Sequence, residues 1–271
     1  MDRPLVDDRQ KALAFVQVSI PYRRLSKEFL PIVTKRRVNV ELGLDAGVLD
    51  GTPLSDFREK AALFGKLGLN VTLHAPFLDL SPGALDPAIL DATRERLRQF
   101  AGVARLFDPL CVVCHTGWDA RHHGFAEKEW LATAEATLRK LTESLAETTR
   151  AYVALENVYE RTPRILIELS RRIAHKRLGF CLDTGHVKAF SGTPLVEWLA
   201  ALGPKIREVH IHDNGGQDDD HLAPGEGVID FAPLFDFLRQ RPGKVILTLE
   251  AHSEAGVMAG LDYIGRHLPG I

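Results

Sequence analysis

Six apolar runs of this chain end on a side chain that can bind a metal ion or move a proton. The runs are Thr72-Leu73-His74, Val112-Val113-Cys114-His115, Val153-Ala154-Leu155-Glu156, Phe180-Cys181-Leu182-Asp183, Val209-His210 and Leu247-Thr248-Leu249-Glu250. Barrel enzymes carry their catalytic groups at the carboxyl ends of parallel strands, on one rim of the barrel. Imidazoles and carboxylates are also the ligands that zinc and related ions prefer. The pattern therefore predicts a metal site on the rim of a barrel.

Four of these residues form the first candidate centre. Glu156, Asp183, His210 and Glu250 end the last four predicted strands. Neighbouring strands lie about 5 Å apart, so the four side chains can converge on one divalent cation. A set of three carboxylates and one imidazole suits Zn²⁺, Mn²⁺, Mg²⁺ or Co²⁺.

Further ligand candidates surround these four in the predicted arrangement. Two end the third and fourth strands, one follows Asp183 by three residues, and two lie on the long loop after the seventh strand: His74, His115, His186, Asp219 and His221. Nine ligands are too many for one ion. We therefore expect one to three divalent ions that share some of the carboxylates.

Three more residues are expected to contact the ligands or the substrate. His212 and His252 follow His210 and Glu250 by two residues, so each points to the same face of its strand. Asn157 follows Glu156 directly.

The spacing of apolar residues predicts the elements that position this site. Eight strands are expected, over residues 14–20, 38–44, 70–76, 110–115, 152–158, 178–183, 206–212 and 245–251. Amphipathic helices are expected between them, over residues 54–67, 87–106, 127–149, 163–174, 195–202, 231–239 and 254–268. Such alternation favours a closed barrel over an open sheet. We predict an α/β fold, a single (β/α)₈ TIM barrel, with residues 1–271 forming one domain.

Composition narrows the classes of function. The chain has 271 residues and a net charge of −2. It therefore lacks the basic excess that would indicate nucleic-acid binding. The three cysteines, Cys111, Cys114 and Cys181, lie inside apolar runs and are interpreted as core thiols in a reducing compartment. The first residues lack the apolar stretch of a signal peptide, and no run reaches transmembrane length. The expected location is the cytoplasm, without a membrane partner.

Several of these motifs together resemble a known family. They are His74-Ala75-Pro76-Phe77, His115-Thr116-Gly117, Leu155-Glu156-Asn157, Leu182-Asp183-Thr184-Gly185-His186, His210-Ile211-His212-Asp213-Asn214 and Asp219-Asp220-His221 before Gly225-Glu226-Gly227. With them the chain resembles the xylose-isomerase-like TIM barrels over roughly residues 13–252. This superfamily includes sugar and sugar-phosphate isomerases or epimerases, and the endonuclease IV family of AP endonucleases (AP endonuclease family 2).

The resemblance implies two different site chemistries. The epimerase-type members hold one metal with a set that falls here on Glu156, Asp183, His210 and Glu250. The endonuclease IV family holds three zinc ions with nine ligands, which fall here on His74, His115, Glu156, Asp183, His186, His210, Asp219, His221 and Glu250. All nine positions match.

The segments around the ligands depart from the endonuclease IV pattern. Gly185 stands where that family usually has a cysteine, and Ile211-His212-Asp213-Asn214 replaces its usual strand-seven motif. The loop expected at residues 45–51 is acidic and has no lysine or arginine. Near strand ends, only Arg121, Arg161 and Lys188 are candidates for contacts with DNA phosphates. In favour of DNA binding, Phe77-Leu78 could wedge into a base stack. These flanks favour the isomerase branch.

The leading expectation is a divalent-metal-dependent sugar or sugar-phosphate isomerase or epimerase. It would transfer protons through a metal-bound enediolate, with Glu156 and Glu250 as base and acid. The alternative is an AP endonuclease or other phosphoesterase with a multinuclear zinc site. A small sugar or sugar phosphate is the expected partner, and DNA only under the alternative. The sequence leaves the substrate, the metal and the oligomeric state open.

Overall fold

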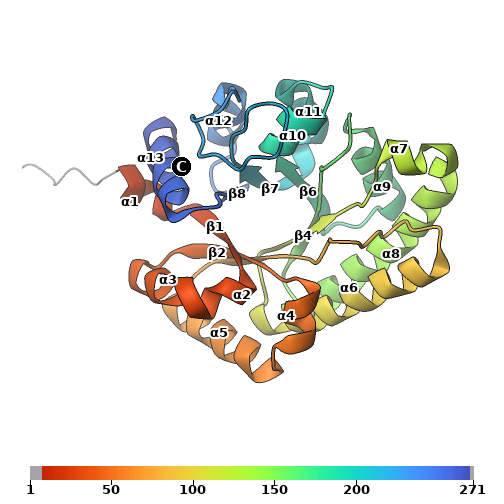
Figure 1. Ribbon diagram of the computed structural model, residues 1–271, viewed down its shortest axis with the longest axis horizontal. Coiled ribbons are helices and arrows are strands. Elements are labelled where there is room, and N and C mark those ends of the chain that lie inside the picture. Colours follow the sequence, from red (N-terminus) through yellow and green to blue (C-terminus); the bar gives the residue numbers. More distant parts are fainter. Residues whose placement is uncertain (1–7, 269–271) are drawn as a thin grey trace, which may run out of the picture.

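The computed structural model describes residues 8–268, which form a closed barrel of eight parallel strands with helices outside it (Figure 1). The strands pair in sequence order: β1 Val16–Pro21, β2 Asn39–Gly43, β3 Val71–His74, β4 Cys111–His115, β5 Tyr152–Glu156, β6 Leu178–Asp183, β7 Ile206–Ile211 and β8 Ile246–Leu249. All eight predicted strands are confirmed, and so is the TIM-barrel fold. That residues 1–271 form a single domain stays a prediction.

The strands are buried on both faces, which explains their composition. All six residues of β6 are buried, and β4 is buried from Cys111 to Cys114. Parallel strands that lie inside a helical layer read as continuous apolar runs for this reason. The same property makes the site residues recognisable in the sequence, because an acid or a histidine at the end of such an apolar run stands out.

The predicted helices also form, with ends shifted by at most one residue. They are α5 Leu54–Leu67, α6 Pro87–Phe107, α8 Glu127–Thr148, α9 Arg164–Ile173, α11 Leu195–Leu202, α12 Ala232–Arg239 and α13 Glu254–His267. Side chains of Asp86 and Ser253 accept backbone N–H groups at the starts of α6 and α13. Such caps satisfy N–H groups that have no partner inside the helix.

Several short helices were not expected from the sequence. They are α1 Asp8–Leu13, α2 Tyr22–Arg24, α3 Leu30–Arg36, α4 Ala46–Gly51, α7 Ala120–His123 and α10 Thr184–Phe190. A π-helical turn at Leu25–Phe29 separates α2 from α3 and interrupts the 3.6-residue spacing on which the prediction depends. Where a loop was expected at residues 45–51, the structure has Asp45 followed by helix α4. The Asp45 carboxylate accepts the Val48 N–H and so caps this helix.

Two composition-based expectations can be compared with the structure. Cys111, Cys114 and Cys181 are buried and free, which confirms the interpretation as core thiols. Within residues 8–268, no helix combines the length and the apolar character that crossing a membrane requires.

Candidate functional site

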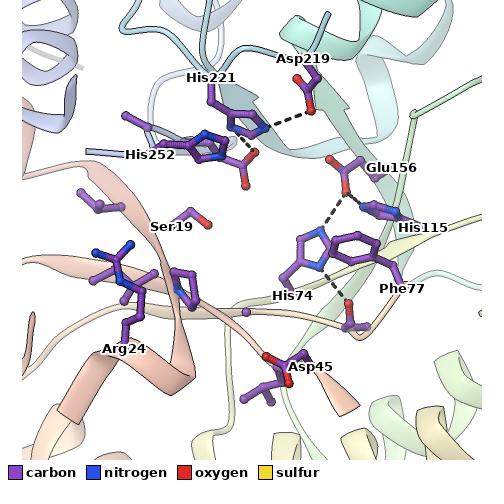
Figure 2. Close-up of a pocket in the computed structure, with 18 of the residues that line it drawn as sticks. Ser19, Arg24, Asp45, His74, Phe77, His115, Glu156, Asp219, His221 and His252 are labelled. Carbon is purple, nitrogen blue, oxygen red and sulfur yellow. Dashed lines mark hydrogen bonds and ion pairs between the residues drawn. The ribbon is translucent and has the colours of Figure 1, made fainter. Parts of the chain in front are cut away.

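A cavity of about 1580 Å³ opens where the strands end (Figure 2). Its lining includes Glu250 and the last residues of five strands: Pro21, Gly43, His74, His115 and Glu156. Ligand cavities of barrel enzymes lie at this rim, and a volume above about 1,000 Å³ exceeds that of most small-molecule sites. The predicted position of the site is therefore a large open cavity.

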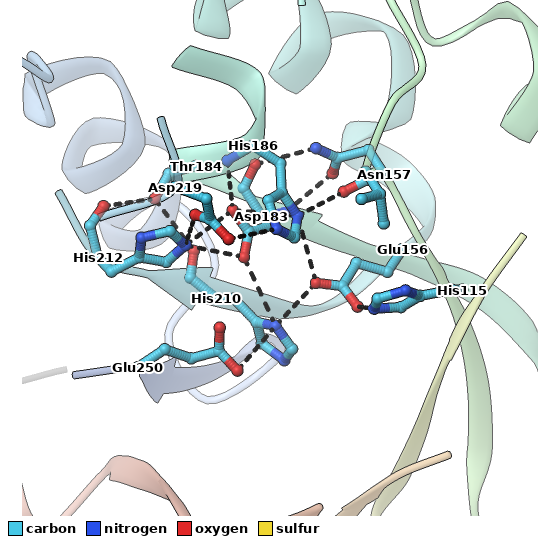
Figure 3. Close-up of polar contacts among 12 residues, drawn as sticks. His115, Glu156, Asn157, Asp183, Thr184, His186, His210, His212, Asp219 and Glu250 are labelled. Atoms are coloured by element: carbon cyan, nitrogen blue, oxygen red, sulfur yellow. Dashed lines mark hydrogen bonds and ion pairs between the residues drawn. The ribbon is translucent and has the colours of Figure 1, made fainter. Parts of the chain in front are cut away.

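The four residues of the first candidate centre, here called the strand-end set, surround one atom. The Nδ1 atom of His210 lies 3.1 Å from Glu156 Oε1, 3.5 Å from Glu250 Oε1 and 3.8 Å from Asp183 Oδ2. His210, Asp183 and Glu156 are buried, whereas Glu250 keeps 14% of its side chain exposed. Figure 3 shows the four side chains converging from β5, β6, β7 and the end of β8. The structure thus brings together the set that the sequence analysis expected.

Two further histidines contact the other oxygen of Glu156. The Nε2 atoms of His115 and His74 lie 2.9 and 3.1 Å from Glu156 Oε2. The ring of Phe77 stacks on His115 at a centroid distance of 4.3 Å and faces the cavity (Figure 2). Glu156 therefore joins this histidine pair to the strand-end set.

The remaining three ligand candidates, here called the outer triad, are His186, Asp219 and His221. Asp219 Oδ2 lies 3.3 Å from His186 Nε2 and 3.0 Å from His221 Nε2. His186 stands at the start of α10, and the other two stand on the loop after β7. The triad touches the strand-end set, because His186 Nδ1 lies 3.5 Å from Asp183 Oδ1. All nine candidates are therefore brought to one place.

The charges of these groups are strongly coupled. Burial alone would lower the pKa of His74, but the hydrogen bond to Glu156 and the charges of Glu156 and Glu41 together outweigh burial and raise this pKa to about 9. Burial alone would raise the pKa of Glu156, yet His115 and His210 hold it well below its usual range. Asp183 and Asp219 raise the pKa of His186 well above its usual value in spite of burial. The carboxylates therefore draw protons onto the imidazoles when no cation neutralises them.

The donor set fits divalent cations. Adjacent ligands of a tetrahedral zinc ion lie roughly 3.3 Å apart, given bonds of about 2.0–2.1 Å, and the contacts described above run from 2.9 to 3.8 Å. Among the described residues, His212 Nδ1, His221 Nδ1 and Asp219 Oδ1 are buried without a hydrogen-bond partner. Buried polar atoms are rarely left unpaired unless an ion or water satisfies them. Both observations favour bound metal.

The three residues expected beside the ligands do contact them. His212 Nε2 lies 3.1 Å from each carboxylate oxygen of Asp183. The Asn157 amide donates to the Asp183 carbonyl at 3.0 Å and accepts the Asp183 N–H at 2.9 Å. His252 stacks on His221 at 4.3 Å and is exposed to the cavity.

Gly185 explains one departure from the endonuclease IV pattern. A Cβ atom at Gly185 would lie 1.9 Å from Cε1 of His212, so no larger residue fits without displacement of the ring. The His212 ring also stacks on His221 at 4.0 Å with an interplanar angle of 4°. Gly185 and His212 therefore form one structural unit that links Asp183 to the outer triad.

Sequence reasoning missed several residues of the site. Glu41 Oε2 lies 3.1 Å from Nε2 of His210, and both side chains are fully buried. Glu160 is buried beside Thr116, and burial raises its pKa to about 7. Asp213 organises the loop after β7, since it accepts the N–H groups of Gly225 and Ile229 at 3.0 Å. A charged residue inside an apolar strand was the available signal for Glu41.

The basic residues that line the cavity are not the expected ones, because Arg121, Arg161 and Lys188 are absent from its lining. Arg23 and Arg24 line the cavity, although neither was among the expected candidates. Each is paired within 2.6 Å, Arg23 with Asp45 and Arg24 with Glu28. The acidic character of residues 45–51 is therefore partly neutralised by a neighbouring arginine.

Comparisons with known proteins identify a family profile and several similar proteins. The sequence profile of the xylose isomerase-like TIM barrel matches residues 39–267. The uncharacterized protein MJ1311 of Methanocaldococcus jannaschii is 33% identical over 190 residues, which span 67% of this chain and 64% of MJ1311. Inosose dehydratase of Clostridium botulinum is 26% identical over 165 residues, or 54% of each chain.

Among solved structures, a D-tagatose 3-epimerase-like protein superposes with a TM-score of 0.78 at 24% identity, over 94% of this chain and 97% of that one. Identity at this level speaks for the fold. The profile match, by contrast, covers most of the chain and includes all nine ligand candidates. The chain therefore belongs to the xylose isomerase-like TIM barrel family.

Proposed function

We propose that this protein is a divalent-metal-dependent isomerase or epimerase that acts on a small sugar or sugar phosphate. One observation carries the proposal: all four members of the strand-end set meet at His210 Nδ1, and only Glu156 and Glu250 of these four line the cavity. Groups that transfer protons must reach the substrate, whereas pure ligands need not. The arrangement provides a buried centre with two carboxylates that line the cavity.

The proposed roles follow from the contacts of each residue. A divalent cation held by the strand-end set would polarise a substrate carbonyl and acidify the neighbouring carbon. Glu250 is the freer proton carrier, because its oxygens lie 3.5 Å from His210 and 3.8 Å from His221, beyond ordinary hydrogen bonds. Glu156 stays ionised, since its pKa is held low by His115 and His210 against burial, and an ionised carboxylate has the free lone pair that a base needs. Glu156 ends β5 and Glu250 follows β8, so the two carboxylates come from different strands and could act as base and acid in an epimerisation.

The comparisons support this choice of substrate class. The similar proteins include one named inosose dehydratase and one described as D-tagatose 3-epimerase-like. We extend the sugar class, and removal of a proton beside a carbonyl, to this chain as part of the proposal.

Deuterium exchange tests the proposal directly. Zinc-, manganese- or cobalt-loaded protein is incubated in D₂O with a panel of ketoses, aldoses and their phosphates, and NMR follows deuterium at the carbon beside the carbonyl. We expect incorporation with at least one sugar, loss of it with a chelator, and loss of it in Glu250→Gln. Glu254→Gln is the matched control, since Glu254 lines the same cavity but is exposed at the start of α13. Absence of exchange with every sugar would contradict the proposal.

A specific observation favours a second candidate, a phosphoesterase of the AP endonuclease kind. The two histidines of the outer triad lie within 3.3 Å of Asp219 Oδ2, and the His74–His115 pair lies within 3.1 Å of Glu156 Oε2. Together with the strand-end set, these make three groups of ligands rather than one. Several ions held close together suit phosphoryl chemistry, where they can hold the attacking and leaving oxygens. Phe77 and Leu78 are also 43% and 71% exposed at the cavity, and apolar side chains of this kind can wedge into a base stack.

The two candidates separate on a duplex containing one abasic site. Under the isomerase proposal, metal-loaded protein leaves the duplex intact at low salt. Efficient incision that is lost in Glu250→Gln, without exchange on any sugar, would replace the leading proposal with the second one.

A further inference from the structure

Glu41 is an unusual residue for the interior of a barrel. It lies in the middle of β2, where it is paired in register with Ser19 on β1 and Thr72 on β3, and its side chain is fully buried. Burying a carboxylate costs several kcal/mol unless a partner offsets the loss of hydration, so a buried glutamate calls for a specific contact. One oxygen of Glu41 accepts the Ser19 hydroxyl at 3.4 Å, and the other faces His210.

The two ring nitrogens of His210 have different surroundings. Nδ1 faces the oxygens of Glu156, Glu250 and Asp183 at 3.1, 3.5 and 3.8 Å, on the side of the mouth (Figure 3). Nε2 faces Glu41 Oε2 at 3.1 Å on the other side of the ring. A neutral imidazole carries its proton on one nitrogen and a lone pair on the other, and the hydrogen bond decides which.

We propose that Glu41 is a positioning residue that accepts the Nε2–H of His210 and thereby presents the Nδ1 lone pair to the metal. The inference rests on the proposed metal centre at the strand-end set. Carboxylates that hold the second nitrogen of a metal-binding histidine fix the ring orientation and increase its basicity. Glu41 acts in this way from β2, a strand that contributes none of the nine ligand candidates.

The opposite arrangement makes a different prediction. Glu41, His210 and Glu250 also have donor atoms within 4.8 Å of one another, so Glu41 could itself be a ligand with His210 bound through Nε2. The contacts favour the positioning role, because three carboxylates lie within 4.0 Å of Nδ1, whereas Glu41 is the only described carboxylate within 4.0 Å of Nε2. The ligand role is therefore the outcome that would overturn the inference.

A second buried glutamate provides a matched control. Glu208 lies on β7, is fully buried and also projects into the barrel. Its Oε1 atom accepts the hydroxyls of Thr248 and Thr72 at 2.6 and 3.1 Å. A glutamine at position 208 keeps the acceptor oxygen for both hydroxyls, whereas a glutamine at position 41 removes the charge that faces His210.

The test compares zinc binding in wild type, Glu41→Gln and Glu208→Gln by competition with a chromophoric chelator. The inference predicts about 10- to 100-fold weaker binding for Glu41→Gln, the range typical of removing such a partner. Glu208→Gln is expected to bind within about threefold of wild type. Equal affinities of wild type and Glu41→Gln would overturn the inference while leaving the proposed function intact. Failure of the wild type to bind zinc, manganese or cobalt would overturn both.

A second measurement is made on the wild-type protein rather than on Glu41→Gln. Imidazole ¹⁵N–¹H correlation spectra of the zinc-loaded wild type show which nitrogen of each histidine carries the proton, with His210→Asn identifying the signal of His210. We expect the proton on Nε2 and the metal on Nδ1. Metal on Nε2 would contradict the positioning role and assign Glu41 as a ligand.

Discussion

The strand-end set and the outer triad have similar side chains but different supports. Glu156, Asp183 and His210 belong to strands and are at most 1% exposed, and Glu250 follows the last residue of β8. Asp219 and His221 stand on a loop, with 28% and 16% of their side chains exposed. His221 also has a positive φ of 52°, which is uncommon for a residue with a side chain.

This difference indicates which of the two sets has a geometry that the barrel alone determines. Paired strands and buried contacts fix the strand-end set, so its geometry comes with the barrel. The outer triad depends on the course of one long loop, which is held by the contacts of Asp213. An isomerase needs only the first centre, whereas the phosphoesterase alternative needs both. The predictions below test the two sets separately.

The largest expected effect follows from Glu250→Gln. This change removes a charge from the strand-end set and the freest proton carrier at the cavity. General acid–base groups contribute about 10²- to 10⁴-fold to turnover, and we expect a loss in this range. Deuterium exchange and product formation on the identified sugar measure it. Turnover within tenfold of wild type would remove Glu250 from the catalytic role.

The second prediction concerns the metal-free protein at alkaline pH. Because the pKa of His74 is raised from about 6.5 in the unfolded chain to about 9 in the folded one, the resulting stabilisation is present below pH 6.5 and is lost as the pH rises through 9. The loss amounts to roughly 3 kcal/mol. Melting temperatures of metal-free protein should fall between pH 7 and pH 9.

Zinc-loaded protein provides the control for that measurement. Histidines bind metal only in their neutral form. The affinity of the protein for zinc should therefore still increase above pH 7, where an unperturbed histidine would already have lost its proton. A metal-free melting temperature that rises between pH 7 and pH 9 would contradict the charge balance described for Glu156 and His74.

The third prediction tests the unit that links the two sets. Gly185→Ala places a Cβ against the His212 ring and should destabilise the protein by about 1–3 kcal/mol. Adding His212→Asn should restore most of that stability, since the smaller side chain leaves room. Denaturant unfolding of the single and double variants measures both effects. Equal stability of Gly185→Ala and wild type would mean that the ring moves freely.

The smallest effect is expected for His115→Ala. If the strand-end set alone performs catalysis, His115 only orients Glu156, and turnover at saturating metal should stay within about tenfold of wild type. A loss as large as that of Glu250→Gln, in a protein that is still folded, would favour the multinuclear phosphoesterase.

The sequence predicted the strand-mounted residues well and their surroundings poorly. His74, His115, Glu156, Asp183 and His210 end buried strands, so an apolar run pointed to each of them. Glu41 lies inside its run rather than at the end, and a search for strand ends passes over it. Its contact with His210 joins β2 to β7, and such distant pairs carry no local pattern.

The shape of the mouth was equally inaccessible from sequence. The stacking of His212, His221 and His252 depends on the path of the loop after β7, which sequence spacing does not specify. The pairing of Arg23 with Asp45 likewise depends on α2 and α4, and a π-helical turn after α2 hid the helical spacing around it. Short-range patterns predict elements, whereas charge pairing across loops requires the fold.

Anomalous scattering from crystals of metal-supplemented protein tests the central claim most directly. The account predicts the strongest metal peak about 2.0–2.6 Å from Nδ1 of His210 and from carboxylate oxygens of Glu156, Asp183 and Glu250. Additional peaks at the outer triad would be compatible with that claim only if they are weaker or are lost first on dialysis. A strongest peak held by His186, Asp219 and His221, with none at His210, would contradict it.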